Sequence, residues 1–112
     1  MKIHYLNLQK QPFKSIKEGT KRIEMRLFDE KRSLISVGDT IIFKSIASDE
    51  TLEVTVISLQ RFPTFKELYN HFDGSILGYK EGEGRSYLDM HHYYPKEAID
   101  KYGVLAIGIS LK

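Results

Sequence analysis

The sequence contains no cysteine, and this absence removes several classes of protein at once. Without thiols the chain cannot build a disulfide framework, a thiolate zinc site or a cysteine nucleophile, and a secreted disulfide scaffold is disfavoured. Long apolar runs are also missing, so no segment is suited to span a bilayer. Residues 1–8 alternate polar and apolar side chains, unlike the continuous apolar core of a signal peptide. We therefore expect a cytoplasmic protein with no membrane partner.

A strong charge of one sign is absent as well. The formal net charge of +2 is too small to identify a nucleic-acid binder from total charge. Basic residues nevertheless outnumber acidic ones between residues 10 and 32, so this segment is locally positive. A solvated face of mixed charge is the alternative explanation, because such faces are common on small proteins.

The length and composition are those of one packed domain. The chain has 112 residues, with 41% hydrophobic and 29% charged side chains, which is close to the average of globular proteins and far from that of disordered chains. This length is enough for one hydrophobic core and too short for two. We expect a single domain over residues 1–112.

Hydrophobic periodicity and turn residues predict strands near both ends and in the middle of the chain, with helices between them. The expected strands are residues 2–8, 21–27, 40–46, 51–59 and 104–111. Short helices are expected near Pro12, after a capping box formed by Thr64 and Glu67, around residues 87–92, and after Pro95. The segment 78–84 is rich in glycine and is expected to be irregular. This order predicts an α+β fold, a small and partly open β-barrel of about five strands with short helices packed around it.

The strand over residues 21–27 carries polar side chains with a spacing of two. Ile23, Met25 and Leu27 alternate with Glu24 and Arg26, so the two sets lie on opposite faces of the strand. Glu24 and Arg26 are therefore predicted to lie side by side and to face a cleft.

Residues 19–26 read GTKRIEMR, which resembles the G-x-K-x-x-E-x-R signature of ASCH domains. The resemblance continues through residues 26–32 (RLFDEKR), 37–41 (VGDTI) and 102–107 (YGVLAI), and it covers nearly the whole chain. It implies a PUA-like fold, a barrel related to RNA-binding modules, with a cleft lined by the signature residues. The partner implied is RNA or a modified nucleoside or nucleotide.

The signature residues are suited to binding a phosphate or a base. Lys21 supplies an ammonium, Glu24 a carboxylate acceptor and Arg26 a guanidinium fork. The leading hypothesis is an RNA-binding module in which Lys21, Arg26, Lys31 and Arg32 contact phosphates and Glu24 recognises a base. Without the resemblance, an exposed salt-bridge ladder would be the first explanation.

Further residues are assigned by their surroundings. Tyr79 is predicted to be an exposed stacking platform for a base, because glycines flank it. Asp29 is predicted to be structural and to stabilise the loop after the strand. The histidines do not have metal-ligand spacing, so we predict neither a metal nor a cofactor, and His4 is expected to border the cleft. The oligomeric state stays open.

The family that this chain resembles also includes enzymes. Among them are a ribonuclease and an amidohydrolase that removes the acetyl group from N4-acetylcytidine. The amidohydrolases use a lysine, a threonine and a glutamate. Here Lys21 matches the lysine, but Glu24 stands at the threonine position, and Thr20 is in the wrong register. The third group would be Glu81 or Glu83.

The alternative function is accordingly a small nucleoside-directed hydrolase that uses Lys21 and Glu24, and slow or no hydrolysis of N4-acetylcytidine is predicted. A protein-interaction module is a third possibility without a sequence feature in its favour. The size of the binding site distinguishes the first two hypotheses, because a shallow basic groove suits an RNA strand, whereas a deep pocket suits a single nucleoside.

Overall fold

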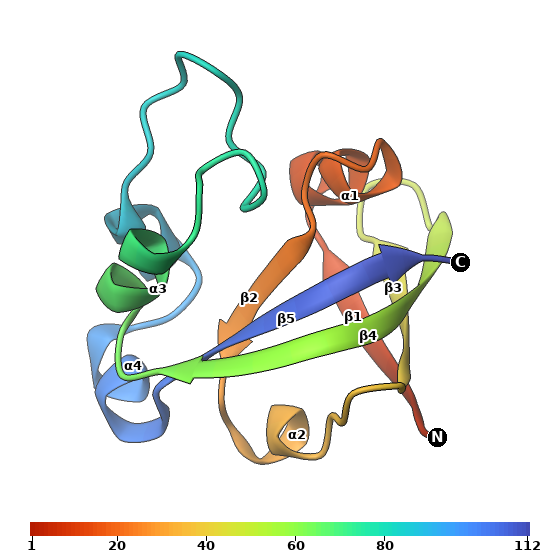
Figure 1. The fold of residues 1–112 in the computed structure, drawn as a ribbon, viewed down its shortest axis with the longest axis horizontal. Helices are drawn as coiled ribbons and strands as arrows, with labels where there is room; N and C mark the ends of the chain where they lie inside the picture. The colour runs from red at the N-terminus through yellow and green to blue at the C-terminus, as the bar shows by residue number, and fades with distance from the viewer.

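Five strands form one curled sheet in the computed structural model, which describes residues 1–112 (Figure 1). The strands are β1 (Ile3–Leu8), β2 (Ile23–Leu27), β3 (Thr40–Ser45), β4 (Thr51–Phe62) and β5 (Val104–Leu111). Their order in the sheet is β1-β3-β4-β5-β2, with β1 parallel to β3 and every other pair antiparallel. β1 and β2 are the two edges, and no strand pairing joins them. The predicted α+β, partly open barrel is therefore confirmed.

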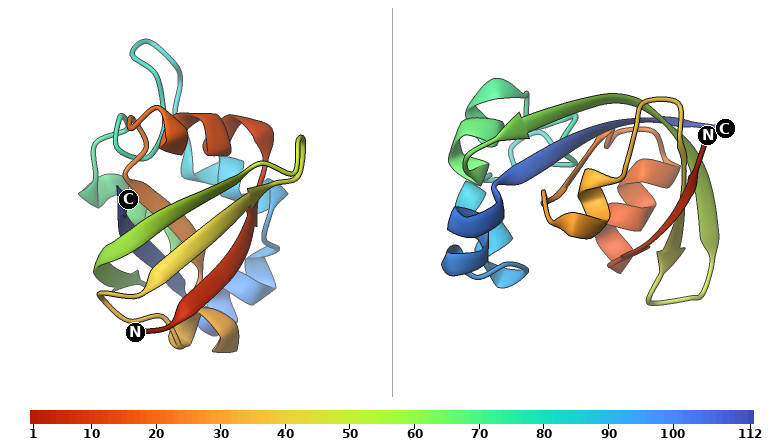
Figure 2. Two further views of the ribbon diagram at one scale, coloured as in Figure 1. Left: turned by 90° about the vertical axis from the view of Figure 1, so that its right-hand side faces the viewer. Right: turned by 90° about the horizontal axis from the view of Figure 1, so that it is seen from below.

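Short helices cover the sheet at two places (Figure 2). They are α1 (Lys10–Lys17), α2 (Glu30–Ser33), α3 (Phe65–His71), the 3-10 helix η1 (Tyr87–His92) and α4 (Lys96–Tyr102). α3, η1 and α4 lie together beyond one end of the sheet, whereas α1 closes the barrel near the end of β1. The predicted capping box is present, because Thr64 accepts a hydrogen bond from the Glu67 backbone N–H at 3.5 Å.

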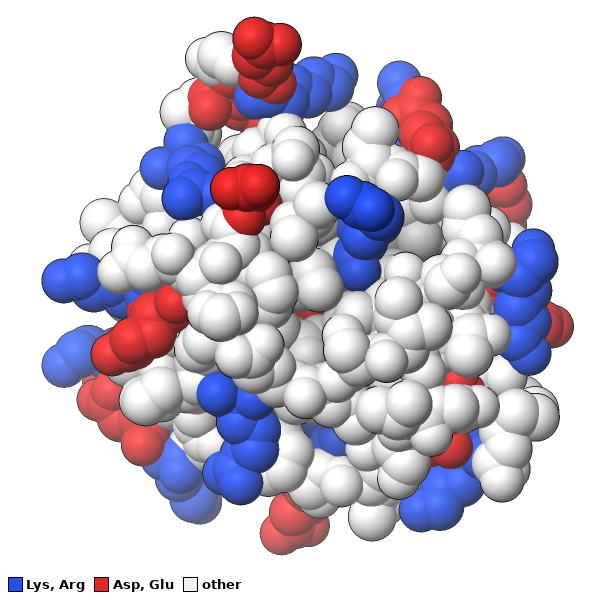
Figure 3. All heavy atoms as spheres, viewed as in Figure 1, with Lys and Arg blue, Asp and Glu red and all other residues white.

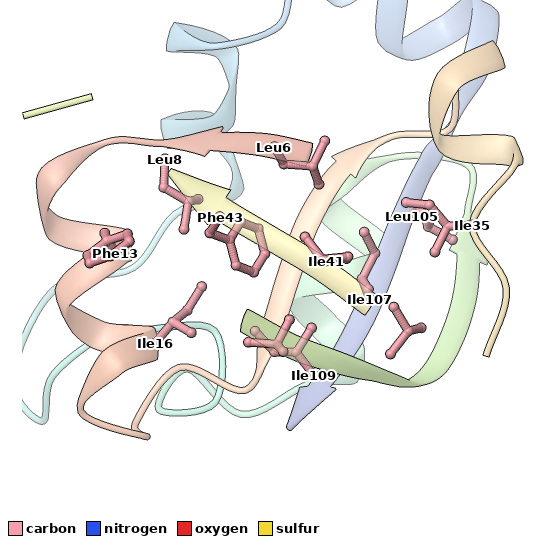
Figure 4. Packing of buried hydrophobic residues seen from close by; sticks show 12 residues of the cluster. Leu6, Leu8, Phe13, Ile16, Ile35, Ile41, Phe43, Leu105, Ile107 and Ile109 are labelled. Carbon is pink, nitrogen blue, oxygen red and sulfur yellow. The ribbon is translucent and has the colours of Figure 1, made fainter. Parts of the chain in front are cut away.

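Two hydrophobic clusters divide the core. The first fills the barrel and includes Ile16, Phe43 and Ile107, all within 1% of complete burial (Figure 4). The second lies between the β2–β5 end of the sheet and the helical layer, where Phe65 and Leu68 are equally buried. β5 contributes to both clusters because its side chains alternate between the two faces and both faces are covered, as is typical of an interior strand.

α1 begins at Lys10, so Pro12 lies near its start as predicted, in the first turn, where backbone N–H groups have no helical partner. Several expected strand boundaries were wrong. β2 begins at Ile23 instead of residue 21, and β3 ends at Ser45. β4 continues three residues beyond residue 59, past a bulge that shifts its register against β5.

The single turn α2 was not expected, and its start lies at Asp29. The Asp29 carboxylate accepts a hydrogen bond from the Arg32 backbone N–H at 3.1 Å and pairs with the Arg32 side chain at 2.6 Å. These contacts cap the turn and fix the chain after β2. The prediction that Asp29 is structural agrees with this arrangement.

Candidate nucleotide-binding cavity

Glu24 is the centre of a buried ionic cluster. Only 3% of the residue is exposed. The Lys21 Nζ lies 3.0 Å from Glu24 Oε1, and the Arg26 Nε and Nη2 each lie 2.8 Å from Oε2. The Lys21 and Arg26 side chains are only 7% and 12% exposed. The alternative explanation, an exposed salt-bridge ladder, is therefore wrong, and Glu24 and Arg26 lie side by side as predicted.

The pairing of β2 with β5 determines the direction in which the Glu24 and Arg26 side chains point. Glu24 lies opposite Ile107 and Arg26 opposite Leu105, and both partners belong to the barrel core. Directly opposed residues of an antiparallel pair share a face, so Glu24 and Arg26 point toward the barrel interior at the open edge of β2.

Lys21 reaches the same place from the turn before β2. Its backbone N–H donates to the Ser15 carbonyl at 3.1 Å, which brings it against α1. Gly78, at φ +104°, covers its side chain, and a Cβ on Gly78 would lie 3.1 Å from Lys21 Cδ. Close approach and positive φ both favour glycine here. The glycine-rich segment thus covers the cluster.

The two cations keep Glu24 ionised despite its burial. Burial acts to raise the pKa of Glu24, but the charges and hydrogen bonds of Lys21 and Arg26 outweigh it and lower that pKa. Burial likewise lowers the pKa of Arg26, whereas Glu24 and the Tyr94 hydroxyl raise it, with a net increase. The cluster therefore carries one net positive charge at neutral pH.

A cavity of about 620 Å³ lies along the free edge of β2, between the barrel and the helical layer. This volume is typical of sites for small molecules. Two cations, Lys21 and Arg26, and the three carboxylates of Glu24, Glu83 and Asp89 line it. The other lining residues are Asn7, Leu8, Gln9, Gln11, Pro12, Ser15, Met25, Ile46, Tyr69, Gly78, Tyr79, Met90, His92, Tyr93 and Tyr94. The charges nearly balance, so the cavity suits a neutral polar ligand.

Charges are also mixed on the outer surface. Figure 3 shows lysine and arginine interspersed with aspartate and glutamate over one face of the molecule, without a continuous basic area. On this face, electrostatic attraction alone would not hold a long anionic strand.

Hydrogen-bonded tyrosines form one wall of the cavity. The Tyr69 and Tyr79 hydroxyls lie 2.8 Å apart, and the Tyr79 hydroxyl donates to Asp89 Oδ2 at 2.8 Å. Burial is the main cause that raises the pKa of both phenols, so they stay protonated. Tyr79 does line the cavity, but the expectation that it is freely exposed was wrong, because its ring packs edge-on against Tyr69 at 5.9 Å.

Other predicted residues lie outside the cavity. Lys31 is exposed and donates to the Tyr5 carbonyl at 3.2 Å, and Arg32 pairs with Asp29. His4 does not border the cleft: its Nε2 lies 2.8 Å from Asp39 Oδ2, away from the lining residues. The structure thus separates the signature cluster from the two basic residues that follow it.

The structure also distinguishes the candidates for a third group. Glu83 lines the cavity and accepts a hydrogen bond from the Lys80 backbone N–H at 2.9 Å, whereas Glu81 does not line it. The Thr20 hydroxyl is used within the fold, because it donates to the Ser15 carbonyl at 3.1 Å.

Several lining residues were not selected from the sequence, including Asn7, Ser15, Tyr69 and Asp89. No motif in the sequence marks any of these four residues. Their places depend on how α1 and η1 pack against β2, which a linear pattern does not encode. No group of three or more histidine and acidic side chains is arranged to hold a metal ion, and no helix is long and apolar enough to cross a membrane.

A family model for the ASCH domain matches residues 6–112. The chain belongs to the ASCH domain family. This family is associated with RNA binding. A comparison with curated proteins found no match.

Solved structures share the fold of this ASCH protein. The crystal structure of hypothetical protein PH0355 is 35% identical with a TM-score of 0.83, and all of both chains is covered. The NMR structure of protein PF0455 from Pyrococcus furiosus is 29% identical with a TM-score of 0.67, covering 97% of this chain and 96% of that one. The S128A mutant of ZmASCH from Zymomonas mobilis has a TM-score of 0.68 and covers 96% of this chain and 67% of its own, but at 12% identity it shows the fold alone.

Proposed function

We propose that this ASCH protein binds RNA, or a free modified nucleoside or nucleotide, by enclosing one base in the cavity beside β2. The observation that carries the proposal is the buried Lys21–Glu24–Arg26 cluster at the edge of a 620 Å³ cavity. A fully paired ionic cluster at a cavity wall provides fixed hydrogen-bonding directions without a large net charge.

The chemistry of the lining favours a base over a phosphate. Glu24 and Asp89 are acceptors that suit the amino groups of a base, and Arg26 is a donor for its carbonyl or ring nitrogen. Tyr79 and Tyr94 add flat apolar surface for stacking. A phosphate placed among three carboxylates would be repelled, since Lys21 and Arg26 already pair with one of them.

The same geometry favours binding over hydrolysis. A carboxylate whose pKa is lowered is a weak general base, and both oxygens of Glu24 are already paired with cations. No hydroxyl stands at its position. We therefore expect no release of cytidine when the protein is incubated with N4-acetylcytidine, and turnover that is lost in Glu24→Gln would favour the hydrolase.

Calorimetric titration with single ribonucleosides, modified nucleosides and short single-stranded RNA tests the proposal. We expect saturable binding of at least one nucleoside, weakened about tenfold or more in Glu24→Gln, because a hydrogen bond to a charged group contributes roughly 1.5–3 kcal/mol. Glu53→Gln is the matched control, since Glu53 is exposed and pairs only with Lys112 at 3.6 Å. Binding that is equally tight in Glu24→Gln, or no binding of any probe, would contradict the proposal.

A further inference from the structure

The free edge of β1 is covered by basic side chains. Alternate carbonyls of β1 are bonded to β3, so the carbonyls of Tyr5 and Asn7 face the open side of the barrel. The Lys31 Nζ donates to the Tyr5 carbonyl at 3.2 Å, and the Arg26 Nη2 donates to the Asn7 carbonyl at 2.7 Å. Side chains of the β2–α2 segment therefore bridge the gap between the two edges.

These two cations form a row that leads out of the cavity. The two carbonyls that they bind, those of Tyr5 and Asn7, are two residues apart on one strand, so these carbonyls lie about 6.6 Å apart. Asn7 and Arg26 line the cavity, whereas Lys31 lies beyond it. The row therefore begins at the mouth of the cavity and continues onto the surface.

Arg32 follows Lys31 directly in α2 and adds a second donor beside it. Its Nη1 pairs with Asp29 at 2.6 Å, but its Nε is buried and has no hydrogen-bond partner. A buried N–H group without a partner is rare in native proteins and calls for an explanation. Burial raises the pKa of Tyr94, a residue of the cavity wall; the charges of Arg26 and Arg32 oppose this effect, and those of Glu24 and Asp29 add to it.

We propose that Lys31 and Arg32 form a phosphate subsite at the mouth of the cavity, which binds the phosphate attached to the nucleoside inside it. This inference rests on the proposed function. Lys31 pairs with no carboxylate, so its charge is available to an anion. The cavity, in which positive and negative charges nearly balance, would bind the neutral base, and Lys31 and Arg32 outside it would bind the phosphate.

Paired titrations test the subsite. Each common ribonucleoside and each modified nucleoside that binds is compared with its 3′- and 5′-monophosphates, in the wild-type protein and in Lys31→Gln, Arg32→Gln and Lys66→Gln. Lys66 is the matched control because it is exposed on α3, outside the cavity lining, and has no ion pair. Inorganic phosphate alone is titrated as well. Because Arg32→Gln also removes the pair with Asp29, its folding is checked by thermal unfolding, and Lys31→Gln provides the independent variant.

We expect one monophosphate to bind about tenfold or more tightly than its nucleoside, and this advantage to fall in Lys31→Gln and Arg32→Gln but not in Lys66→Gln. Nucleoside binding itself stays unchanged in all three variants. A nucleoside that binds without any gain from its phosphate would overturn the subsite and leave the base cavity standing. If neither nucleoside nor monophosphate binds, the proposed function fails first and the subsite with it.

Discussion

Replacement of Glu24 by alanine would leave two buried cations without their partner. Lys21 and Arg26 are almost fully enclosed and each contacts the Glu24 carboxylate within 3.0 Å. Removal of one member of a buried ion pair costs about 3–5 kcal/mol, and water in the neighbouring cavity should keep the cost near the lower limit, about 3 kcal/mol. With an unfolding entropy of about 2.1 cal/mol/K per residue, this corresponds to a Tm lowered by roughly 13 °C.

The comparison that makes this prediction specific is a triple variant, Lys21→Met, Glu24→Leu and Arg26→Met. Apolar side chains of similar volume remove the desolvation cost together with the charges, so the triple variant should unfold at a higher temperature than Glu24→Ala. It should nevertheless bind no nucleoside. Urea unfolding followed by circular dichroism measures both stabilities. A loss below about 1 kcal/mol in Glu24→Ala, the value of an exposed pair, would refute the buried-cluster reasoning.

Three further predictions concern Asp39 and Asp29, which lie outside the cavity, and Gly78, which lines it. Asp39 accepts hydrogen bonds from His4 and from the backbone N–H groups of Lys2 and Ser36, and these bonds lower the pKa of Asp39. The stability that ionised Asp39 provides is therefore complete above about pH 4 and is lost as the pH falls further. Asp39→Asn should flatten the acid side of a curve of Tm against pH. Asp29→Ala should reduce stability by about 1 kcal/mol, as loss of a helix cap does, with nucleoside affinity unchanged in the same titration; unchanged stability with lost affinity would reverse its role. Gly78→Ala should weaken nucleoside binding while the protein stays folded, because the added Cβ displaces the Lys21 side chain and the positive φ is strained; wild-type affinity would show that Lys21 need not be held in place.

The order of the strands along the chain, and which side chains share a face of β2, could be predicted from the sequence. Alternation of Ile23, Met25 and Leu27 with Glu24 and Arg26 is a local property of the pleat, and it correctly placed the two charged side chains together. The capping box of α3 and the start of α4 after Pro95 are equally local. Elements defined by neighbours in sequence were therefore predicted well.

The burial of the charged side chains on β2 could not be predicted from such local patterns. An alternating strand is normally half exposed, but β2 is covered on its apolar face by the helical layer, and its polar face is closed off by α1 and by the segment around Gly78. The same long-range packing brings Ser15 and Asp89 to the cavity and directs His4 toward Asp39. Contacts between segments distant in sequence decide these features, and no motif in the chain encodes them.

A crystal structure with a bound nucleoside monophosphate tests the central claim most directly. We expect a base inside the cavity, within hydrogen-bond distance of Glu24 or Arg26, and the phosphate beside Lys31 and Arg32, between β1 and α2. A nucleotide bound on the outer face of the sheet, with the cavity empty, would contradict the proposed function.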